Sequence, residues 1–208
     1  MNEKPELKVD WCSYDAAKYA CTHWHYSKCL PTGKLVKIGV WEDNKYIGVV
    51  IFGRGASPYL SRTYGLTQIE CIELTRVALS NHINTVTKIV SISIDKIKKS
   101  MLGLRLIVSF ADPFHSHVGV IYQAGNWIYA GDSDKTKMWH IAGKRLHHRS
   151  VGAKYGTTVL EKVRILEPGA EIEIAPGKHK YLMPLDKKMR REILKLKKPY
   201  PKKGEVEL

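Results

Sequence analysis

LRLIVSFADPFHSHVGVIYQAGNWIYAG, residues 104–131, is the most informative stretch of the sequence. It opens with the largely apolar run Leu104–Val108, which is typical of a strand buried on both faces. Pro113 closes that run and leaves Ser109 and Asp112 at the carboxyl end of the strand. Because open α/β sheets usually bind ligands at the carboxyl ends of their strands, the sequence predicts a ligand edge here.

The residues before this stretch predict a βαβ crossover. Two strands, Ile69–Leu79 and Leu104–Phe110, flank the helix Val86–Met101, whose apolar residues recur at helical spacing. The crossover aims the helix N-terminus at the same sheet edge, where its unpaired N–H groups suit a phosphate or pyrophosphate. Neither GxGxxG nor GxxxxGK[ST] occurs to support such a site. The predicted cofactor-binding residues at this helix start are Asn84, Thr85, Val86 and Thr87.

The strand Ile69–Leu79 carries one charge on each face among apolar neighbours. Alternation places Glu73 on one face and Arg76 on the other. A buried carboxylate is costly unless it is paired or used, so Glu73 is a candidate catalytic residue and Arg76 a candidate cofactor contact. The alternative is that Glu73 only forms a structural ion pair.

The remaining elements follow from local patterns. Tyr14–His25 reads as a helix, and the four-residue turn Glu42–Lys45 joins two strands into a hairpin. The loop from Gly53 to Gln68 is long enough to be functional and carries Arg54 and Arg62. The other predicted elements are hairpin strands Lys34–Trp41 and Tyr46–Phe52, strands Val159–Leu166 and Ala170–Ala175, and a basic helix Leu185–Leu196.

Composition favours an intracellular protein with a polyanionic partner. Lys and Arg outnumber Asp and Glu by 34 to 20, and residues 178–208 hold 11 of the former against 4 of the latter. No apolar stretch is long enough to cross a bilayer, and no signal-peptide core is visible, so we expect no membrane partner and a cytoplasmic location. The four cysteines are irregularly spaced, which favours reduced thiols.

Length favours one core with a basic addition. At 208 residues the chain can bury one good core and needs no disulfide or metal merely to fold. We predict a catalytic domain over residues 1–176 and a basic C-terminal extension over residues 177–208, packed on or trailing from it.

Two further groups of residues suit chemistry. His25 and Tyr26 suit a hydrogen-bonding or proton-transfer pair beside a pocket, or a helix end satisfied by packing. Cys21 and His25 share a helical face, but the spacing of this cluster does not match a zinc site.

Tyr122 can donate a proton to a leaving group or serve in the core. Asp112 can orient an amine nucleophile or act as a turn residue.

The order of elements resembles the GCN5-related N-acetyltransferase fold. The resemblance rests on the order hairpin, strand, long helix and strand, followed by Gly119, Tyr122, Gly125 and Trp127. The resemblance implies an α/β (α+β) mixed sheet flanked by helices, with Tyr122 as general acid near a thioester. The family's glycine-containing phosphate signature should fall at residues 80–88, where this chain has SNHINTVTK. That departure weakens the prediction of acetyl-coenzyme A binding.

The chain is also similar to the phage Mom family, whose members modify adenine and protect bacteriophage DNA from restriction. The matching pieces are His25–Ser27, Gly48–Gly55, Glu73–Arg76, Leu106–Pro113, Gly119–Tyr122, Asn126–Trp127, Tyr155–Gly156 and Pro199–Lys202.

This second resemblance implies a transferase that alters the exocyclic amino group of adenine in double-stranded DNA by carbamoylmethylation. It makes His25, Tyr26, Ser109, Asp112 and Tyr122 the candidate active-site residues, with Glu73 and Arg76 supporting them. It also implies a possible iron ion near the His-Tyr pair, which the sequence itself neither supports nor excludes.

The donor and the contacts to DNA are less defined. Acyl-coenzyme A and aminoacyl-tRNA are both possible donors, so tRNA is a possible second partner. Carbamoylmethylation needs an N–CH₂ bond, which simple acyl transfer does not form.

Adenine must be flipped out of the duplex to react, which requires phosphate contacts and an aromatic stack. The predicted DNA contacts are Arg54, Arg62, His147, Arg149, Lys187, Arg190 and Lys198.

Two alternative functions stay open at this point. A conventional N-acyltransferase for a small amine or protein predicts tight coenzyme A binding. A non-catalytic basic DNA-binding protein predicts affinity for DNA and no modified base.

Overall fold

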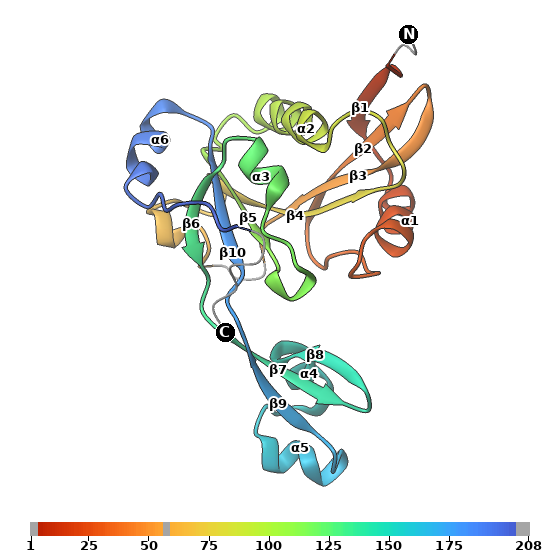
Figure 1. Ribbon diagram of the computed structural model, residues 1–208, viewed down its shortest axis with the longest axis vertical. Coiled ribbons are helices and arrows are strands. Elements are labelled where there is room, and N and C mark those ends of the chain that lie inside the picture. The colour runs from red at the N-terminus through yellow and green to blue at the C-terminus, as the bar shows by residue number, and fades with distance from the viewer. Residues whose placement is uncertain (1–3, 56–58, 203–208) are drawn as a thin grey trace. The chain divides into compact units, whose positions relative to one another are not determined.

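The computed structural model describes residues 4–55 and 59–202, which fall into two compact units (Figure 1). The first comprises the described residues up to Phe110, together with Gly119–Gly131 and Lys180–Tyr200. The second comprises Ala111–Val118, Asp132–His179 and the described residues after Tyr200. This division does not follow the predicted boundary at residue 176, because residues 180–200 belong with the first unit. The assignment of a catalytic domain and an extension stays a prediction.

A mixed sheet forms the framework of the first unit. Within the described residues it has seven strands in the order β1-β2-β3-β4-β5-β10-β6. β4 and β5 run parallel, with Leu74 opposite Ser109, so the predicted βαβ crossover is confirmed. The strands are β1 (Leu7–Trp11), β2 (Leu35–Glu42), β3 (Lys45–Gly53), β4 (Cys71–Leu79), β5 (Leu106–Ala111), β6 (Ile128–Asp132) and β10 (His179–Pro184).

The predicted hairpin is also confirmed, with a tighter turn than expected. β2 and β3 pair from Leu35 opposite Gly53 to Glu42 opposite Lys45, so only Asp43 and Asn44 form the turn. Both turn residues have positive φ, at 47° and 64°, as two-residue hairpin turns require. The strand β1 was missed, although its sequence LKVDW alternates apolar and charged residues as expected of an edge strand.

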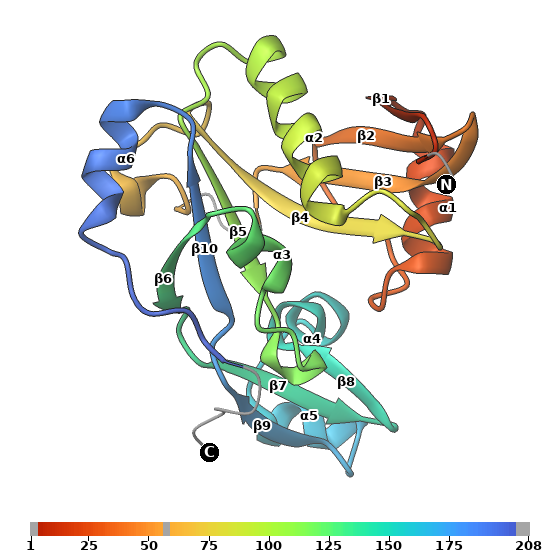
Figure 2. The same ribbon diagram turned by 45° about the horizontal axis from the view of Figure 1, so that its top comes forward.

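Helices flank this sheet (Figure 2). α1 (Tyr14–Trp24) starts at Ser13, whose side chain accepts the Ala16 N–H, and it buries Ala17, Ala20 and Cys21 against β3 and β4. α2 (Val86–Ser100) is capped by Thr85, whose side chain accepts the Lys88 N–H, and it buries an apolar stripe. The shorter helices of this unit are the 3₁₀ turn η1 (Arg62–Tyr64), α3 (Val120–Ala124) and α6 (Lys187–Leu194).

The predicted basic helix is confirmed as α6, and the residues after it are held in place. Met189 and Ile193 are buried in a cluster that includes Leu106 and Val108 of β5. Beyond the helix, the Lys198 N–H donates to the Tyr129 carbonyl. The Tyr200 hydroxyl donates to the Trp127 carbonyl at 2.7 Å. Both acceptors belong to the segment of β6.

A three-stranded antiparallel sheet and two helices form most of the second unit. Its strands, β7 (Thr136–Ile141), β8 (Lys144–His147) and β9 (Glu171–Ala175), lie in the order β8-β7-β9. One sheet face packs Trp139 and Ile141 against α4 (His148–Tyr155) and α5 (Leu160–Leu166). A 3₁₀ turn, η2 (Pro113–His115), belongs to the same unit.

The sequence predictions were weakest in this second unit. The predicted strand Val159–Leu166 is wrong, because α5 occupies these residues. Leu160 and Val163, one helical turn apart, pack on the sheet, while Ile165 and Leu166 are exposed. The predicted strand Ala170–Ala175 is confirmed as β9.

Two further observations complete the fold. All four cysteines are free, as predicted for reduced thiols. Across the described ranges, no helix combines the length and the apolar character needed to traverse a bilayer.

Candidate active site

A buried pair of hydroxyl groups, Tyr122 and Ser109, lies at the centre of the candidate site. Their oxygen atoms are 2.7 Å apart, and the Ser109 Oγ also lies 2.7 Å from the Leu74 carbonyl oxygen. A serine hydroxyl has one proton, and the carbonyl can only accept. The consistent assignment is therefore that Ser109 donates to Leu74 and Tyr122 donates to Ser109.

The surroundings of Tyr122 keep its hydroxyl protonated. Burial raises the pKa of Tyr122 to about 12. Tyr26, Glu73 and Tyr181 act electrostatically on the hydroxyl in the same direction as burial. At neutral pH the group is thus a proton donor and not a base. Three predicted residues, Tyr26, Glu73 and Ser109, are brought together around Tyr122.

Tyr181, which sequence reasoning missed, supports the Tyr122 ring. The two ring centroids are 5.0 Å apart, and the Tyr181 hydroxyl accepts a hydrogen bond from the Gln123 amide at 3.1 Å. Gly119 has φ +74°, and a Cβ there would lie only 2.3 Å from the Tyr181 ring. The glycine is therefore required by both its backbone conformation and the close approach of Tyr181. Tyr181 is distant in sequence and has no flanking motif, so no local signal marks it.

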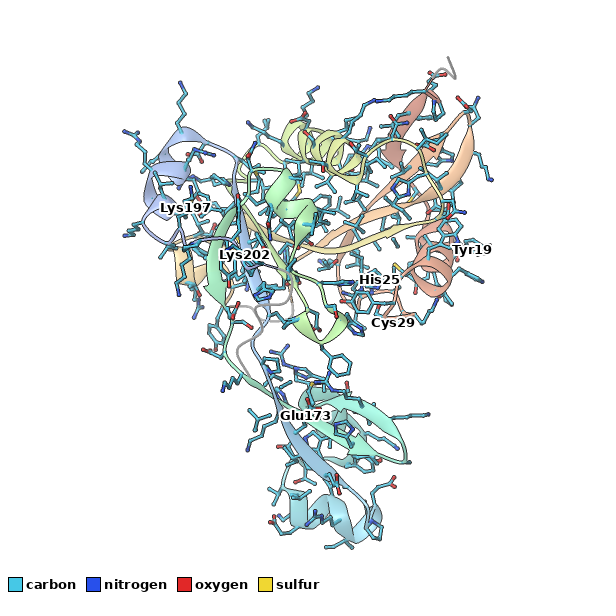
Figure 3. The ribbon with its side chains drawn as sticks, viewed as in Figure 1. Tyr19, His25, Cys29, Glu173, Lys197 and Lys202 are labelled. Atoms are coloured by element: carbon cyan, nitrogen blue, oxygen red, sulfur yellow. The ribbon has the colours of Figure 1, made fainter. Side chains whose placement is uncertain are left out.

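His25 and Tyr26 follow directly after α1, and Figure 3 labels His25 at this point of the chain. Their ring centroids are 4.2 Å apart. His25 is 8% exposed, and its Nδ1 accepts the Ser27 N–H at 3.1 Å. The Ser27 hydroxyl lies 2.8 Å from the same nitrogen. Because Nδ1 is an acceptor, a neutral His25 carries its proton on Nε2.

A bulge in β4 puts Glu73 and Arg76 on the same face of the sheet, opposite Gly53 and Ile51, so the predicted placement on opposite faces is wrong. Pairing with β3 passes from Ile51–Arg76 to Phe52–Leu74, so Thr75 is the extra residue. Glu73 acts electrostatically on Tyr122, whereas Arg76 acts electrostatically on the buried Cys21 thiol of α1. The Arg76 Nη1 donates to the Thr75 carbonyl, while its buried Nε has no partner among the described residues. The cofactor role predicted for Arg76 stays a prediction.

Asp112 lies in the second unit, so its predicted grouping with Ser109 and Tyr122 stays a prediction. Its side chain caps η2 by accepting the Phe114 N–H at 3.1 Å and pairs with Lys178 at 3.0 Å. Burial alone would raise the pKa of Asp112, but the interactions with Lys178 outweigh it and lower the pKa.

A carboxylate of the protein occupies the region just before α2. The nearly buried Glu42 accepts the backbone N–H groups of Ile83 and Asn84, the latter at 2.6 Å, and also the Asn84 side-chain amide. Asn84 in turn accepts a hydrogen bond from Lys88. Burial opposes ionisation of Glu42, but these amide donors lower its pKa. A pyrophosphate bound here would meet this negative charge, so the residues do not fit the phosphate site predicted for Asn84–Thr87.

The donor set around His25 does not fit an iron ion either. Among residues 4–55 and 59–202, no three His, Cys, Asp or Glu side chains gather as a metal site requires. One ring nitrogen of His25 is already an acceptor for Ser27. No step of the chemistry is therefore derived through a metal.

The predicted DNA contacts are distributed over both units. In the first unit, Arg54 and Arg62 lie in the loop after β3, Lys187 and Arg190 on α6, and the exposed Lys198 packs its aliphatic part over Gly131. Arg62 also stacks over the Tyr59 ring. In the second unit, Arg149 is exposed, and His147 caps α4 through its Nδ1. Burial lowers the pKa of His147 to about 4, so it is neutral at physiological pH.

Strands β1 to β4 pair antiparallel, and the β4–α2–β5 crossover then adds β5 parallel to β4, with Tyr122 following β5. This arrangement defines an acetyltransferase-like mixed α/β fold. This is the fold class predicted from the sequence. The chain belongs to the Mom protein family, which matches residues 6–202. It is 26% identical over 205 residues to the methylcarbamoylase mom of Escherichia phage Mu, covering 95% of this chain and 84% of that protein.

Solved structures give weaker similarities. A protein assigned as an acetyltransferase from Acinetobacter baylyi has 14% identity and a TM-score of 0.47, covering 89% of this chain and 96% of the other. The AHL synthase LasI has 9% identity and a TM-score of 0.44, covering 90% and 94% of the two chains.

Proposed function

We propose that this protein is a transferase that modifies the exocyclic amino group of adenine in double-stranded phage DNA and so protects it from restriction. The observation that carries the proposal is the buried Tyr122–Ser109 pair, beside Tyr26 and Glu73, in a chain of the Mom family. The modification proposed is of the carbamoylmethyl type, by analogy with the phage Mu relative, which bears the name methylcarbamoylase.

The geometry supplies a proton donor and a carboxylate for a group transfer. Adenine's amino group is a poor nucleophile, because its lone pair is delocalised into the ring. The nitrogen must therefore lose a proton as its new bond to carbon forms, and the leaving group must gain one. Tyr122, held protonated by burial, is the proposed donor to the leaving group. Glu73, which acts electrostatically on Tyr122, is the proposed acceptor of the amine proton.

The donor molecule is proposed separately from the target. The Glu42 carboxylate in front of α2 argues against a donor held there by its pyrophosphate. An aminoacyl-tRNA donor needs no such cradle and would use the basic surface of the protein. Transfer of its acyl group forms an amide at the adenine nitrogen and releases the tRNA hydroxyl. For a glycyl group, a rearrangement to the isomeric N–CH₂–CO–NH₂ linkage must then follow. Loss of activity after ribonuclease treatment of a purified reaction supports this donor. Full activity with coenzyme A esters as the sole donor contradicts it.

DNA as the substrate is supported by the charges on α6. The side chains of Lys187, Lys188, Arg190, Arg191 and Lys195 have no ion pair or hydrogen bond within the described part of the chain. The nearby acids Asp186 and Glu192 contact Arg105 instead. A groove of about 520 Å³ runs along the helix, lined by Lys187, Arg190, Arg191 and Leu194. Free cations along a groove suit a phosphate backbone.

Mass spectrometry of nucleosides from cells expressing the chain tests the function. In the nucleosides released from DNA we expect a modified deoxyadenosine that disappears in the Tyr122→Phe variant. An unmodified adenine pool in the presence of soluble, folded wild-type protein overturns the proposal. Tight binding of coenzyme A with acylation of a small amine would instead favour a conventional N-acyltransferase, and DNA affinity without any modified base would favour a DNA-binding protein.

A further inference from the structure

The second unit presents one large aromatic side chain in an otherwise polar setting. Phe114 lies in η2 and is 53% exposed. Its sequence neighbours are His115, Ser116 and His117, all exposed. A surface that docks another protein usually has several apolar side chains at its centre. A single aromatic among imidazole and cationic groups is instead typical of surfaces that stack nucleobases.

The Phe114 ring is fixed in place from one side by Arg145. The guanidinium carbon lies 3.8 Å from the ring centroid, which is the geometry of a stacked cation–π pair. Arg145 is itself held by Glu173, which accepts from its Nε at 3.0 Å and its Nη2 at 3.2 Å. Glu173 also accepts from His140 at 2.8 Å. The aromatic ring is therefore backed by a hydrogen-bonded network across β8, β9 and β7.

The backbone that carries Phe114 is fixed as well. Pro113 restricts the backbone at the first position of η2, and Asp112 accepts the Phe114 N–H. Lys178 pairs with the same carboxylate at 3.0 Å. A rigid aromatic loses little conformational freedom when it binds, so its exposed surface is prepared for a planar partner.

We infer that Phe114, stacked on Arg145, is a nucleobase platform that stacks an unpaired base of the target DNA. The inference rests on the proposed function, because an enzyme acting on adenine's amino group must take the base out of the duplex. Stacking on a rigid aromatic would compensate part of the lost base stacking. Two carboxylates near the ring, Asp112 and Glu173, are each paired with a cation, Lys178 and Arg145, so these two acids add no net negative charge that would repel a phosphate.

The test compares two probes, a duplex oligonucleotide with one unpaired 2-aminopurine and the fully paired duplex. We expect the wild-type full chain to bind the unpaired probe about tenfold more tightly and to quench its fluorescence. The Phe114→Leu variant should lose both the preference and the quenching, whereas Phe114→Trp should keep them. Trp11→Leu is a matched control, because Trp11 is 48% exposed and also lies under a cation, Lys96.

Retention of the preference by a folded Phe114→Leu variant overturns the inference, and so does its absence in the wild-type protein. A preference that the Trp11→Leu control also loses overturns it as well. These outcomes are separate from the proposed function, which is decided by the modified adenosine that the wild-type protein makes in cells. If the wild-type protein makes modified adenine but the Phe114→Leu variant binds the unpaired probe as tightly as wild type does, the platform inference is wrong and the proposed function stands.

Discussion

Ser109 has one hydroxyl proton and two oxygen atoms at 2.7 Å, and this limits what the Tyr122 site tolerates. Replacement by alanine leaves the buried Tyr122 hydroxyl without its acceptor, which should cost about 1–3 kcal/mol of unfolding free energy. Tyr122→Phe should cost less, because Ser109 still donates to Leu74. The double variant should be more stable than Ser109→Ala alone. Urea denaturation measures all three, and a Ser109→Ala variant as stable as wild type contradicts the assignment.

Activity should respond in the opposite order of severity. Tyr122→Phe removes the proposed proton donor and should lower the rate of adenine modification by about 10²–10⁴-fold. Ser109→Ala keeps that donor but loses the group that orients it, so its loss should be smaller. The rate is measured as modified adenosine formed per unit of folded protein. Equal losses in the two variants would contradict the separation of roles.

Gly119 offers a second test at the scale of one residue. Gly119→Ala adds a Cβ that would lie 2.3 Å from the Tyr181 ring, in a backbone conformation with positive φ. Gly65→Ala is the matched control, because Gly65 also has positive φ but nothing within 4 Å of the added carbon. We expect Gly119→Ala to be less stable than Gly65→Ala by about 1–3 kcal/mol. Thermal or chemical unfolding measures the difference, and equal losses contradict the close packing.

Glu42 decides how the start of α2 behaves as an element. Glu42→Gln removes the negative charge that the Ile83 and Asn84 amides bind, and should cost about 1–3 kcal/mol at neutral pH. The pKa of Glu42 is lowered in the folded protein. The contribution of Glu42 to the free energy of unfolding is therefore present above pH 4.5 and is lost as the pH falls through the folded-state pKa. The difference between variant and wild type should therefore shrink in acid. Glu161→Gln on α5, an exposed position, is the control.

α6 is the element whose charges should set the salt dependence of DNA binding. Replacing Arg190 and Arg191 by glutamate should weaken binding to all sequences. If both contact phosphates, the slope of log K against log salt should become shallower by about 2, at roughly 0.9 per contact. Lys98→Glu with Lys99→Glu makes the same charge change on α2 and should leave the slope nearly unchanged. An unchanged slope in the α6 variant would show that α6 is not the contact.

Acid should destabilise the whole molecule in two stages. The pKa of His147 falls from 6.5 to about 4 on folding, mainly through burial. Its contribution to the free energy of unfolding is therefore fully present above pH 6.5 and is lost as the pH falls towards 4. The pKa of Glu173 falls from 4.5 to about 2 through Arg145 and His140, so that contribution is lost between 4.5 and 2. Urea midpoints across this range measure both stages. His147→Asn, which keeps a capping acceptor, should remove only the first.

Across the molecule, sequence reasoning succeeded where one local pattern determines the outcome. The crossover was predictable because the stripe of α2 and the apolar run of β5 are both unambiguous. Residues 159–166, VLEKVRIL, were mistaken for a strand because their three β-branched residues were given more weight than the helix-forming Leu, Glu, Lys and Arg among them. Leu160 and Val163, at helical spacing, pack in the cluster of Trp139 and Ile141. Pairing Ser109 with Tyr122 was predictable from one short stretch. The Tyr181 support and the Glu42 carboxylate depend on contacts distant in sequence, which no local pattern indicates.

The two units also differ in a way that spectroscopy can use. Trp127 is 1% exposed and lies 5.0 Å from Tyr122, and Trp139 is fully buried in the second unit. Each unit therefore contains its own tryptophan shielded from water, and one of the two indoles adjoins the candidate site. In variants that retain only one of these two residues and none of the other three tryptophans of the chain, emission reports a single unit. Fluorescence can then follow donor or DNA binding at Tyr122 independently of the unit that carries Phe114, without any attached dye.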